Sequence, residues 1–217
     1  MAKIPRRHFL KLGALGGLIA ATISGCHARD LLRIPTPSEA KGPFYPVEDQ
    51  TDKDFDLTKV NGQEDVADGQ HIIILGHITD REGNPVAGAS IDIWQANARG
   101  RYNHPNDSSP EPLDQNFQGW AIITCGEDGA FRFKTVMPGA YPASDIWTRP
   151  PHIHFKISKP GFITLITQMY FPDEQLNKTD LLLRHKNAQE RPLMIAKQIS
   201  NEEEIAVYEY NIVLAEK

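Results

Sequence analysis

Short runs of alternating or β-branched residues recur along the chain after residue 70, each bounded by turn-forming residues. Runs of this length and composition are typical of β-strands. The runs that predict strands are His71–Thr79, Ala89–Gln95, Trp120–Thr124, Phe131–Thr135, His152–Ser158, Thr164–Phe171 and Ala206–Leu214. So many short strands predict an all-β fold, an antiparallel β-sandwich with little helix. Thr179–His185 is the segment in which we expect a short helix.

Two long stretches show neither strand nor helix periodicity. They are Gly100–Gly119 and Pro138–Pro151, and both are rich in proline and polar residues. Long ordered loops in compact domains usually carry function, because a rigid scaffold positions them. We therefore expect these two loops to form the functional site of the sandwich.

The charge of the chain is unevenly distributed. The 217 residues carry a net charge of −5, yet residues 1–25 hold four basic residues and no acidic one. The remainder holds 19 basic and 28 acidic residues. Affinity for nucleic acid comes mostly from cationic contacts to phosphate, so this acidic body predicts no nucleic-acid partner. The length predicts one domain with a tail.

The first 26 residues read as an export address. Arg6-Arg7 and the residues after them resemble a twin-arginine signal, and Leu12–Gly25 is uncharged and too short to span a bilayer. The stretch ends at Cys26 in a sequence that resembles the lipobox of bacterial lipoproteins. We expect a periplasmic or membrane-anchored lipoprotein, attached through a lipidated Cys26. A plain signal peptide cleaved nearby and an uncleaved anchor are the alternatives.

The predicted organisation is a signal segment over residues 1–25, a polar spacer over 26–41 and a β-sandwich domain over 42–217. If Cys26 begins the mature chain and is lipidated, Cys125 is its only free thiol. An intramolecular disulfide is then excluded.

Two histidines begin one of the predicted strands. Residues two apart on a strand share a face, so His152 and His154 point one way while Ile153, Phe155 and Ile157 point into the core. Two imidazoles on one face are well placed to share a metal ion. The alternative is a pair of solvent-facing histidines.

The residues around this pair favour one kind of metal over another. Zinc sites usually add cysteine, histidine or carboxylate ligands, but no Cys, Asp or Glu lies between Asp145 and Asp173. Tyr141 does lie nearby, and although an aromatic between prolines ordinarily packs, a phenolate oxygen suits a hard ferric ion. Arg149 precedes the pair and would stabilise negative charge, unless it forms a structural ion pair.

Taken together, the motifs resemble those of the intradiol ring-cleavage dioxygenases. The motifs occur in order along the chain as Gly42-Pro43-Phe44-Tyr45-Pro46, Trp94-Gln95-Ala96-Asn97-Ala98-Arg99-Gly100-Arg101-Tyr102, Pro138-Gly139-Ala140-Tyr141-Pro142, Arg149-Pro150-Pro151-His152-Ile153-His154 and Thr167-Gln168-Met169-Tyr170-Phe171. The chain most resembles the iron-binding β chains of the protocatechuate 3,4-dioxygenases, a branch of that family.

The resemblance implies a mononuclear non-haem Fe(III) cofactor and a set of site residues. The implied iron ligands are Tyr102, Tyr141, His152 and His154, and the implied catalytic residues are Arg149, Tyr141 and Gln168. Tyr141 matches the phenolate that leaves when substrate binds.

The resemblance also implies a reaction and its partners. The substrates would be a catechol-type diol and O2, and cleavage between the two hydroxyl-bearing carbons would give a cis,cis-muconate-type product. Both protocatechuate 3,4-dioxygenase-like and catechol 1,2-dioxygenase-like activities fit, and the sequence leaves the particular catechol open. An oligomer is expected, with a related second chain as one form of it.

Three other protein classes share parts of this pattern. A transthyretin-like or carbohydrate-binding sandwich module would need no catalysis. A copper–zinc superoxide dismutase-like protein would need a disulfide that the mature chain cannot form. A cupin would have a glutamate a few residues after the histidine pair, where Ser158 and Lys159 stand.

Overall fold

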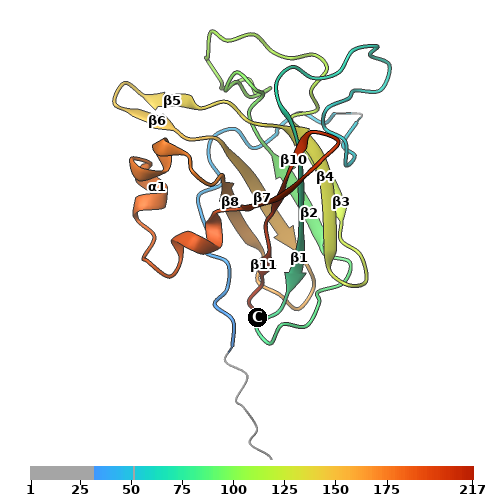
Figure 1. Cartoon of the computed structure of the whole chain (residues 1–217), viewed down its shortest axis with the longest axis vertical. Helices are drawn as coiled ribbons and strands as arrows, with labels where there is room; N and C mark the ends of the chain where they lie inside the picture. Colours follow the sequence, from blue (N-terminus) through green and yellow to red (C-terminus); the bar gives the residue numbers. More distant parts are fainter. Residues whose placement is uncertain (1–31, 51) are drawn as a thin grey trace, which may run out of the picture. The chain divides into compact units, whose positions relative to one another are not determined.

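The computed structural model describes residues 32–50 and 52–217, which form two main β-sheets and a small hairpin (Figure 1). The first sheet contains β1 (His71–Thr79), β4 (Ala130–Val136), β9 (Lys197–Glu202), β10 (Ile205–Glu209) and β11 (Ile212–Val213). The second sheet has the order β3 (Trp120–Thr124), β2 (Ser90–Trp94), β7 (His152–Ser158) and β8 (Leu165–Tyr170). The hairpin consists of β5 (Tyr141–Ser144) and β6 (Trp147–Arg149).

The hydrophobic core lies between the two main sheets. Ile153, Phe155 and Ile157 on β7 are fully buried, as the alternation predicted. The ring of Phe155 lies 6.0 Å from Phe133 and 6.3 Å from Phe131, both on β4 of the opposite sheet. These contacts confirm a β-sandwich, in which inward-facing side chains from both sheets interdigitate.

The pairing of β1 differs from the antiparallel arrangement that the sequence predicts. β1 pairs antiparallel with β4 but parallel with both β10 and β11. The predicted strand Ala206–Leu214 is divided between these last two elements. The break occurs at Tyr210, whose carbonyl oxygen lies so close to Gly76 that a Cβ there would overlap it. The alternation of polar and apolar residues shows which face of a strand is buried, but it does not show which strand pairs with it. The parallel pairings therefore could not be predicted from the pattern of each segment.

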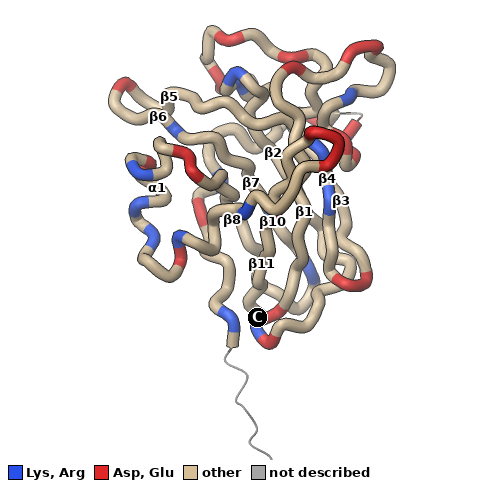
Figure 2. Tube along the Cα trace, viewed as in Figure 1, with Lys and Arg blue, Asp and Glu red and all other residues tan. Residues whose placement is uncertain are grey.

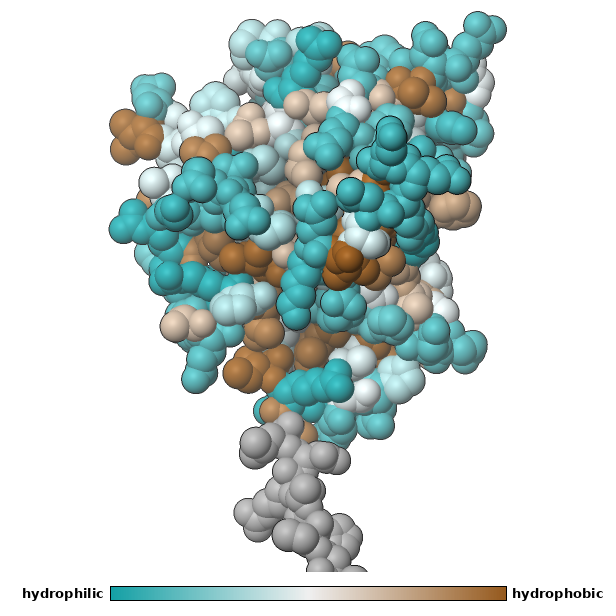
Figure 3. Space-filling view, in the orientation of Figure 1, coloured by the Kyte–Doolittle hydropathy of each residue, from teal (hydrophilic) through white to brown (hydrophobic). Residues whose placement is uncertain are grey.

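One of the two expected loops contains regular structure. Pro138–Pro151 forms the β5–β6 hairpin, whereas Gly100–Gly119 holds neither strand nor helix. Ile146 at the hairpin tip is 96% exposed, and Figure 3 shows apolar surface at that tip. β5 and β6 are short, and Pro142 interrupts the alternation of polar and apolar residues. The sequence pattern therefore did not predict these two strands.

Helical structure is confined to short elements. The α-helix α1 (Leu181–Arg184) lies inside the predicted segment Thr179–His185. Two 3₁₀ turns flank it, η1 (Gln175–Lys178) and η2 (Arg191–Met194). Across the described residues we find no helix with the length and apolarity that a bilayer crossing requires.

Part of the predicted spacer is attached to the sandwich. Thr36 and Pro37 are buried, the Thr36 N–H donates to the Val213 carbonyl, and Thr167 Oγ1 donates to the Pro37 carbonyl at 2.7 Å. Residues 33–40 therefore belong to the folded unit. The predicted signal segment 1–25 and Cys26 lie outside the described residues.

Candidate active site

The two histidines of β7 lie side by side in the interior. β7 is an inner strand between β2 and β8, where His154 pairs with Trp94 on one side and Gln168 on the other. The imidazole rings of His152 and His154 are 4.9 Å apart, and the two residues are only 2% and 3% exposed. They are therefore not a solvent-facing pair.

Each imidazole is held in a defined orientation. His152 Nδ1 donates to the Pro150 carbonyl at 2.6 Å, which leaves Nε2 unprotonated and able to bind a cation. His154 stacks on Trp94 at 4.8 Å with the ring planes 9° apart. The Nδ1 atom of His154 is buried and has no hydrogen-bond partner among the described residues. An unsatisfied buried nitrogen of this kind is costly unless a ligand relieves it.

Burial keeps both imidazoles neutral. Burial, and after it the positive charge of Arg149, lowers the pKa of His152 well below its ordinary value. The same two causes lower the pKa of His154 to about 3. Neutral imidazoles are the form that coordinates metal ions.

Two tyrosines approach the histidines from the two predicted loops. Tyr102 is 3% exposed, and its Oη atom lies 3.4 Å from His152 Nε2. The ring of Tyr141 is 5.6 Å from that of Tyr102 and 5.7 Å from that of His152. Burial and then the neighbouring Tyr141 raise the pKa of Tyr102 well above its usual range. Burial also raises the pKa of Tyr141, against the charge of Arg149, which lowers it.

Two glycines allow the tyrosine loops to cross closely. The N–H groups of Gly100 and Gly139 both donate to the Asn97 carbonyl, at 3.0 and 2.9 Å. A Cβ on Gly139 would overlap the Gly100 nitrogen and lie 2.7 Å from the Ala98 carbonyl oxygen. Only glycine permits this approach of one backbone to another. The crossing thus places Tyr102, two residues after Gly100, beside Tyr141, two residues after Gly139.

Arg149 is buried at the end of β6 and is held by three acceptors. Its Nε donates to Asp180 Oδ2 at 2.8 Å, while Nη2 donates to Gln168 Oε1 at 2.6 Å and to Tyr170 Oη at 3.1 Å. Asp180 is fully buried and also caps α1, because its Oδ1 accepts from the Leu183 N–H at 2.8 Å. The structure therefore places Arg149 both beside the histidines and in an ion pair, so the two sequence-based interpretations are compatible.

Sequence reasoning missed two members of this group. Tyr170 follows Gln168 by two residues on β8 and so shares its face, a periodicity that the sequence does contain. Asp180 directly precedes the leucine-rich α1, which marks it as an N-cap but gives no sign of its bond to Arg149.

A cavity of about 540 Å³ opens onto these residues. Its buried floor includes Arg149, His154 and Gln168, with Tyr141 beside them. Its walls come from the segment before Phe44, the Gly100–Gly119 loop, the β5–β6 hairpin and α1. Four of the predicted site residues thus line one cavity, namely Tyr141, Arg149, His154 and Gln168. Tyr102 and His152 lie behind them, in contact with Tyr141 and His154.

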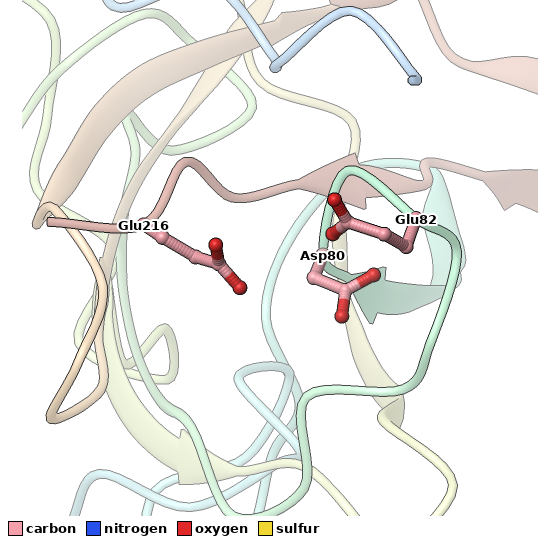
Figure 4. A group of neighbouring side chains, drawn as sticks. All are labelled: Asp80, Glu82 and Glu216. Carbon is pink, nitrogen blue, oxygen red and sulfur yellow. The ribbon is translucent and has the colours of Figure 1, made fainter. Parts of the chain in front are cut away.

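A cluster of carboxylates lies elsewhere in the molecule. Asp80, Glu82 and Glu216 approach one another in Figure 4, and Glu82 and Glu216 are exposed. Both oxygens of Asp80 already accept hydrogen bonds from Asn84, at 2.8 Å each. The cluster is accounted for by this turn and is separate from the candidate active site.

Comparisons with known proteins identify the family of the chain. A family model described as "Dioxygenase" matches residues 40–216. The protocatechuate 3,4-dioxygenase β chain of Burkholderia cepacia is 37% identical, over 79% of this chain and 76% of its own length. The chain belongs to the intradiol ring-cleavage dioxygenase family. This assignment sets aside the superoxide dismutase-like and cupin alternatives.

Two further relatives of this chain show the range of the family. The 6-chlorohydroxyquinol 1,2-dioxygenase of Cupriavidus pinatubonensis is 32% identical over 76% of this chain, and the chain spans 60% of that protein's length. A solved dioxygenase domain, from a dioxygenase carbohydrate-binding protein fusion of Streptomyces sp. SirexAA-E, is 27% identical with a TM-score of 0.64. It covers 85% of this chain and 100% of its own.

Proposed function

We propose that this family member is a non-haem Fe(III) intradiol dioxygenase that opens the ring of a catechol-type diol with O2. The observation that supports the proposal is the convergence of two phenols and two imidazoles from separate segments. One phenol and one imidazole of this group, Tyr141 and His154, line a cavity. Both atoms of O2 would enter the product, a cis,cis-muconate-type dicarboxylate.

The donor set fits a ferric ion. Donor atoms bound to one ion at about 2.1 Å lie up to about 4 Å apart, and Tyr102 Oη and His152 Nε2 are 3.4 Å apart. The proposed ligands are Tyr102, Tyr141, His152 and His154. Two phenolates would neutralise much of the charge of Fe(III), so the site avoids a large uncompensated buried charge. When bound, the ion would act as a Lewis acid and would lower the pKa of coordinated phenol groups.

The remaining chemistry belongs to side chains of the chain. Burial raises the pKa of the unligated Tyr141 phenol, so a Tyr141 phenolate not bound to a metal would accept a proton at Oη from an entering catechol hydroxyl. The Arg149 guanidinium would stabilise negative charge on the substrate, and Gln168 Oε1 keeps it in place. Arg149 and Gln168 are buried, and the lower dielectric of the protein interior strengthens both interactions.

The chain's colour and oxygen consumption test this function. Tyrosinate bound to Fe(III) absorbs visible light, so iron-loaded protein should be coloured and should consume O2 with a catechol. His152→Ala should lose at least nine-tenths of the iron. Tyr102→Phe should shift or weaken the visible band.

An iron-replete but colourless protein would contradict the tyrosinate ligands. A coloured protein that consumes no O2 with any catechol would instead support a sandwich module without catalysis.

Export and assembly are further parts of the proposal. The sequence of residues 1–26 supports twin-arginine export and lipidation at Cys26, which would place the enzyme in the periplasm or on a membrane. The relative named as a β chain supports an oligomer, with a related chain as one candidate partner. The net negative charge of residues 26–217 argues against a nucleic-acid partner.

A further inference from the structure

The cavity at the candidate active site has a polar floor and a mostly apolar wall. Arg149, His154 and Gln168 at the floor are each less than 5% exposed. The apolar wall residues include Phe44, Pro110, Pro142, Ala143, Trp147 and Leu182, and Asn106, Ser108 and Ser109 add uncharged polar groups. A diol whose hydroxyls meet the floor would therefore direct its ring substituents toward apolar side chains.

Among the residues that line this cavity, Arg149 is the only cation, and its charge is already compensated. Nε is bonded to the Asp180 carboxylate, and Nη2 is shared between Gln168 and Tyr170. The basic residues near α1, whose backbone positions are blue in Figure 2, do not line the cavity. The wall thus offers a substituent no free positive charge.

A carboxylate also contributes to the wall. Asp107 lines the cavity, with Oδ2 accepting from the Tyr102 N–H at 2.7 Å and Oδ1 from the Ser109 N–H at 2.8 Å. It has no ion-pair partner in the described part of the chain. Like charges repel, and an unpaired substrate carboxylate would also lose its hydration.

The size of the cavity indicates a substituted ring. A volume of about 540 Å³ falls within the range of about 300 to 1,000 Å³ in which proteins bind drug-sized molecules. An unsubstituted catechol would leave much of that space to water, whereas an apolar substituent would bury the surfaces of Leu182, Ala143 and Trp147.

We propose that the substrates are uncharged catechols with an apolar ring substituent, and that the apolar wall beside Asp107 rejects catechols that carry a carboxylate. The inference rests on the proposed function and specifies its substrate class. This arrangement points to Leu182 as the specificity-determining residue. Leu182 belongs to α1 and lines the wall, and the N-cap of that helix, Asp180, accepts the hydrogen bond that holds Arg149 at the floor.

The test compares two ligands that differ chiefly in charge. Iron-loaded full-length protein is titrated without oxygen at pH 7 with 3,4-dihydroxybenzoate and with its methyl ester, and binding is followed by calorimetry. We expect the ester to bind at least tenfold more tightly than the acid. We also expect 4-tert-butylcatechol to bind at least tenfold more tightly than catechol.

A charge placed on the wall provides the matched variant. Leu182→Lys should strengthen binding of the acid about tenfold and weaken binding of 4-tert-butylcatechol. Leu181→Lys adds the same charge one residue earlier, on a side chain that is 44% exposed and absent from the lining. Leu181→Lys should leave the ratio of the affinity for the acid to the affinity for 4-tert-butylcatechol unchanged.

The outcomes separate this inference from the proposed function. If the acid binds as tightly as its ester, or if both lysine variants act alike, the substrate class is wrong while the dioxygenase function stands. If no catechol binds to iron-loaded protein, the proposed function fails and the inference fails with it.

Discussion

At the scale of single residues, the ion pair between Arg149 and Asp180 holds two opposite charges in the buried site. The side chains of the two residues are 5% and 0% exposed, so each charge depends on the other. Removing one partner of a buried pair leaves an uncompensated charge, which usually costs 3 to 5 kcal/mol.

We therefore predict that Asp180→Asn lowers the free energy of unfolding by about 3 kcal/mol in denaturant titrations. Asparagine can still cap α1, so the loss reports the ion pair and not the helix. Adding Arg149→Gln should recover part of the stability, because it removes the orphaned charge. As a control, Glu202→Gln breaks the half-exposed pair with Arg132 and should cost less than about 1 kcal/mol. A double variant less stable than Asp180→Asn would contradict this account.

The buried histidines predict a pH dependence of stability in the iron-free protein. Burial lowers the pKa of His154 to about 3, whereas in the unfolded chain it is near the ordinary value of 6.5. Below pH 6.5 the imidazole of His154 is protonated in the unfolded state but stays neutral in the folded state, so acidification favours unfolding. The contribution of neutral His154 to the free energy of unfolding is fully present above pH 6.5 and is lost as the pH falls toward 3.

Replacing His154 by glutamine should remove this dependence. Between pH 6 and pH 4 the iron-free wild type should lose about 2 kcal/mol more stability than His154→Gln. His77→Gln, at an exposed position, should follow the wild type. Identical pH slopes in all three proteins would show that His154 is accessible to protons in the folded state.

At the scale of elements, the position of the phenols depends on where two loops cross. The crossing relies on Gly100 and Gly139, and β7 with its histidines takes no part in it. The two halves of the site should therefore respond separately to substitution.

We predict that Gly139→Ala lowers iron content severalfold while the sandwich remains folded. The added methyl group would push the loops apart and displace Tyr102 and Tyr141, at a cost of about 1 to 3 kcal/mol. Iron stoichiometry and circular dichroism measure the two effects. Gly161→Ala is the control, since its φ of 91° imposes strain but its Cβ would meet nothing within 4 Å. Full iron occupancy in Gly139→Ala would refute the role of the crossing.

The sequence predicts elements well where one face is buried. The alternation of β7 indicates both the buried isoleucines and the shared face of the histidines. β9 escapes detection because every residue in it is exposed, so it lacks that alternation. The convergence of tyrosines with histidines follows from the family resemblance and not from spacing, since the loop crossing involves contacts distant in sequence. The bond between Asp180 and Arg149 is hidden for the same reason.

At the scale of the whole molecule, the export proposal concerns residues outside the described ranges. We predict that replacing Arg6 and Arg7 by lysines retains the protein in the cytoplasm, because the receptor reads the arginine pair as an address. Fractionation of expressing cells, followed by immunoblotting, measures the distribution. Substituting Lys3 and Lys11 by arginine, which preserves the charge and the pair, should leave export intact. Unchanged fractionation of the Arg6/Arg7 variant would refute the signal.

The histidines belong to a hydrogen-bonded inner strand, whereas Tyr102 lies on a loop and Tyr141 begins the small β5–β6 hairpin outside the two main sheets. Loops diverge between relatives far more readily than the strands they connect. A descendant of this gene could exchange two loops and thereby acquire a different metal preference, or none, without rebuilding its scaffold. Loss of chemistry and loss of fold are consequently separate evolutionary events in this architecture.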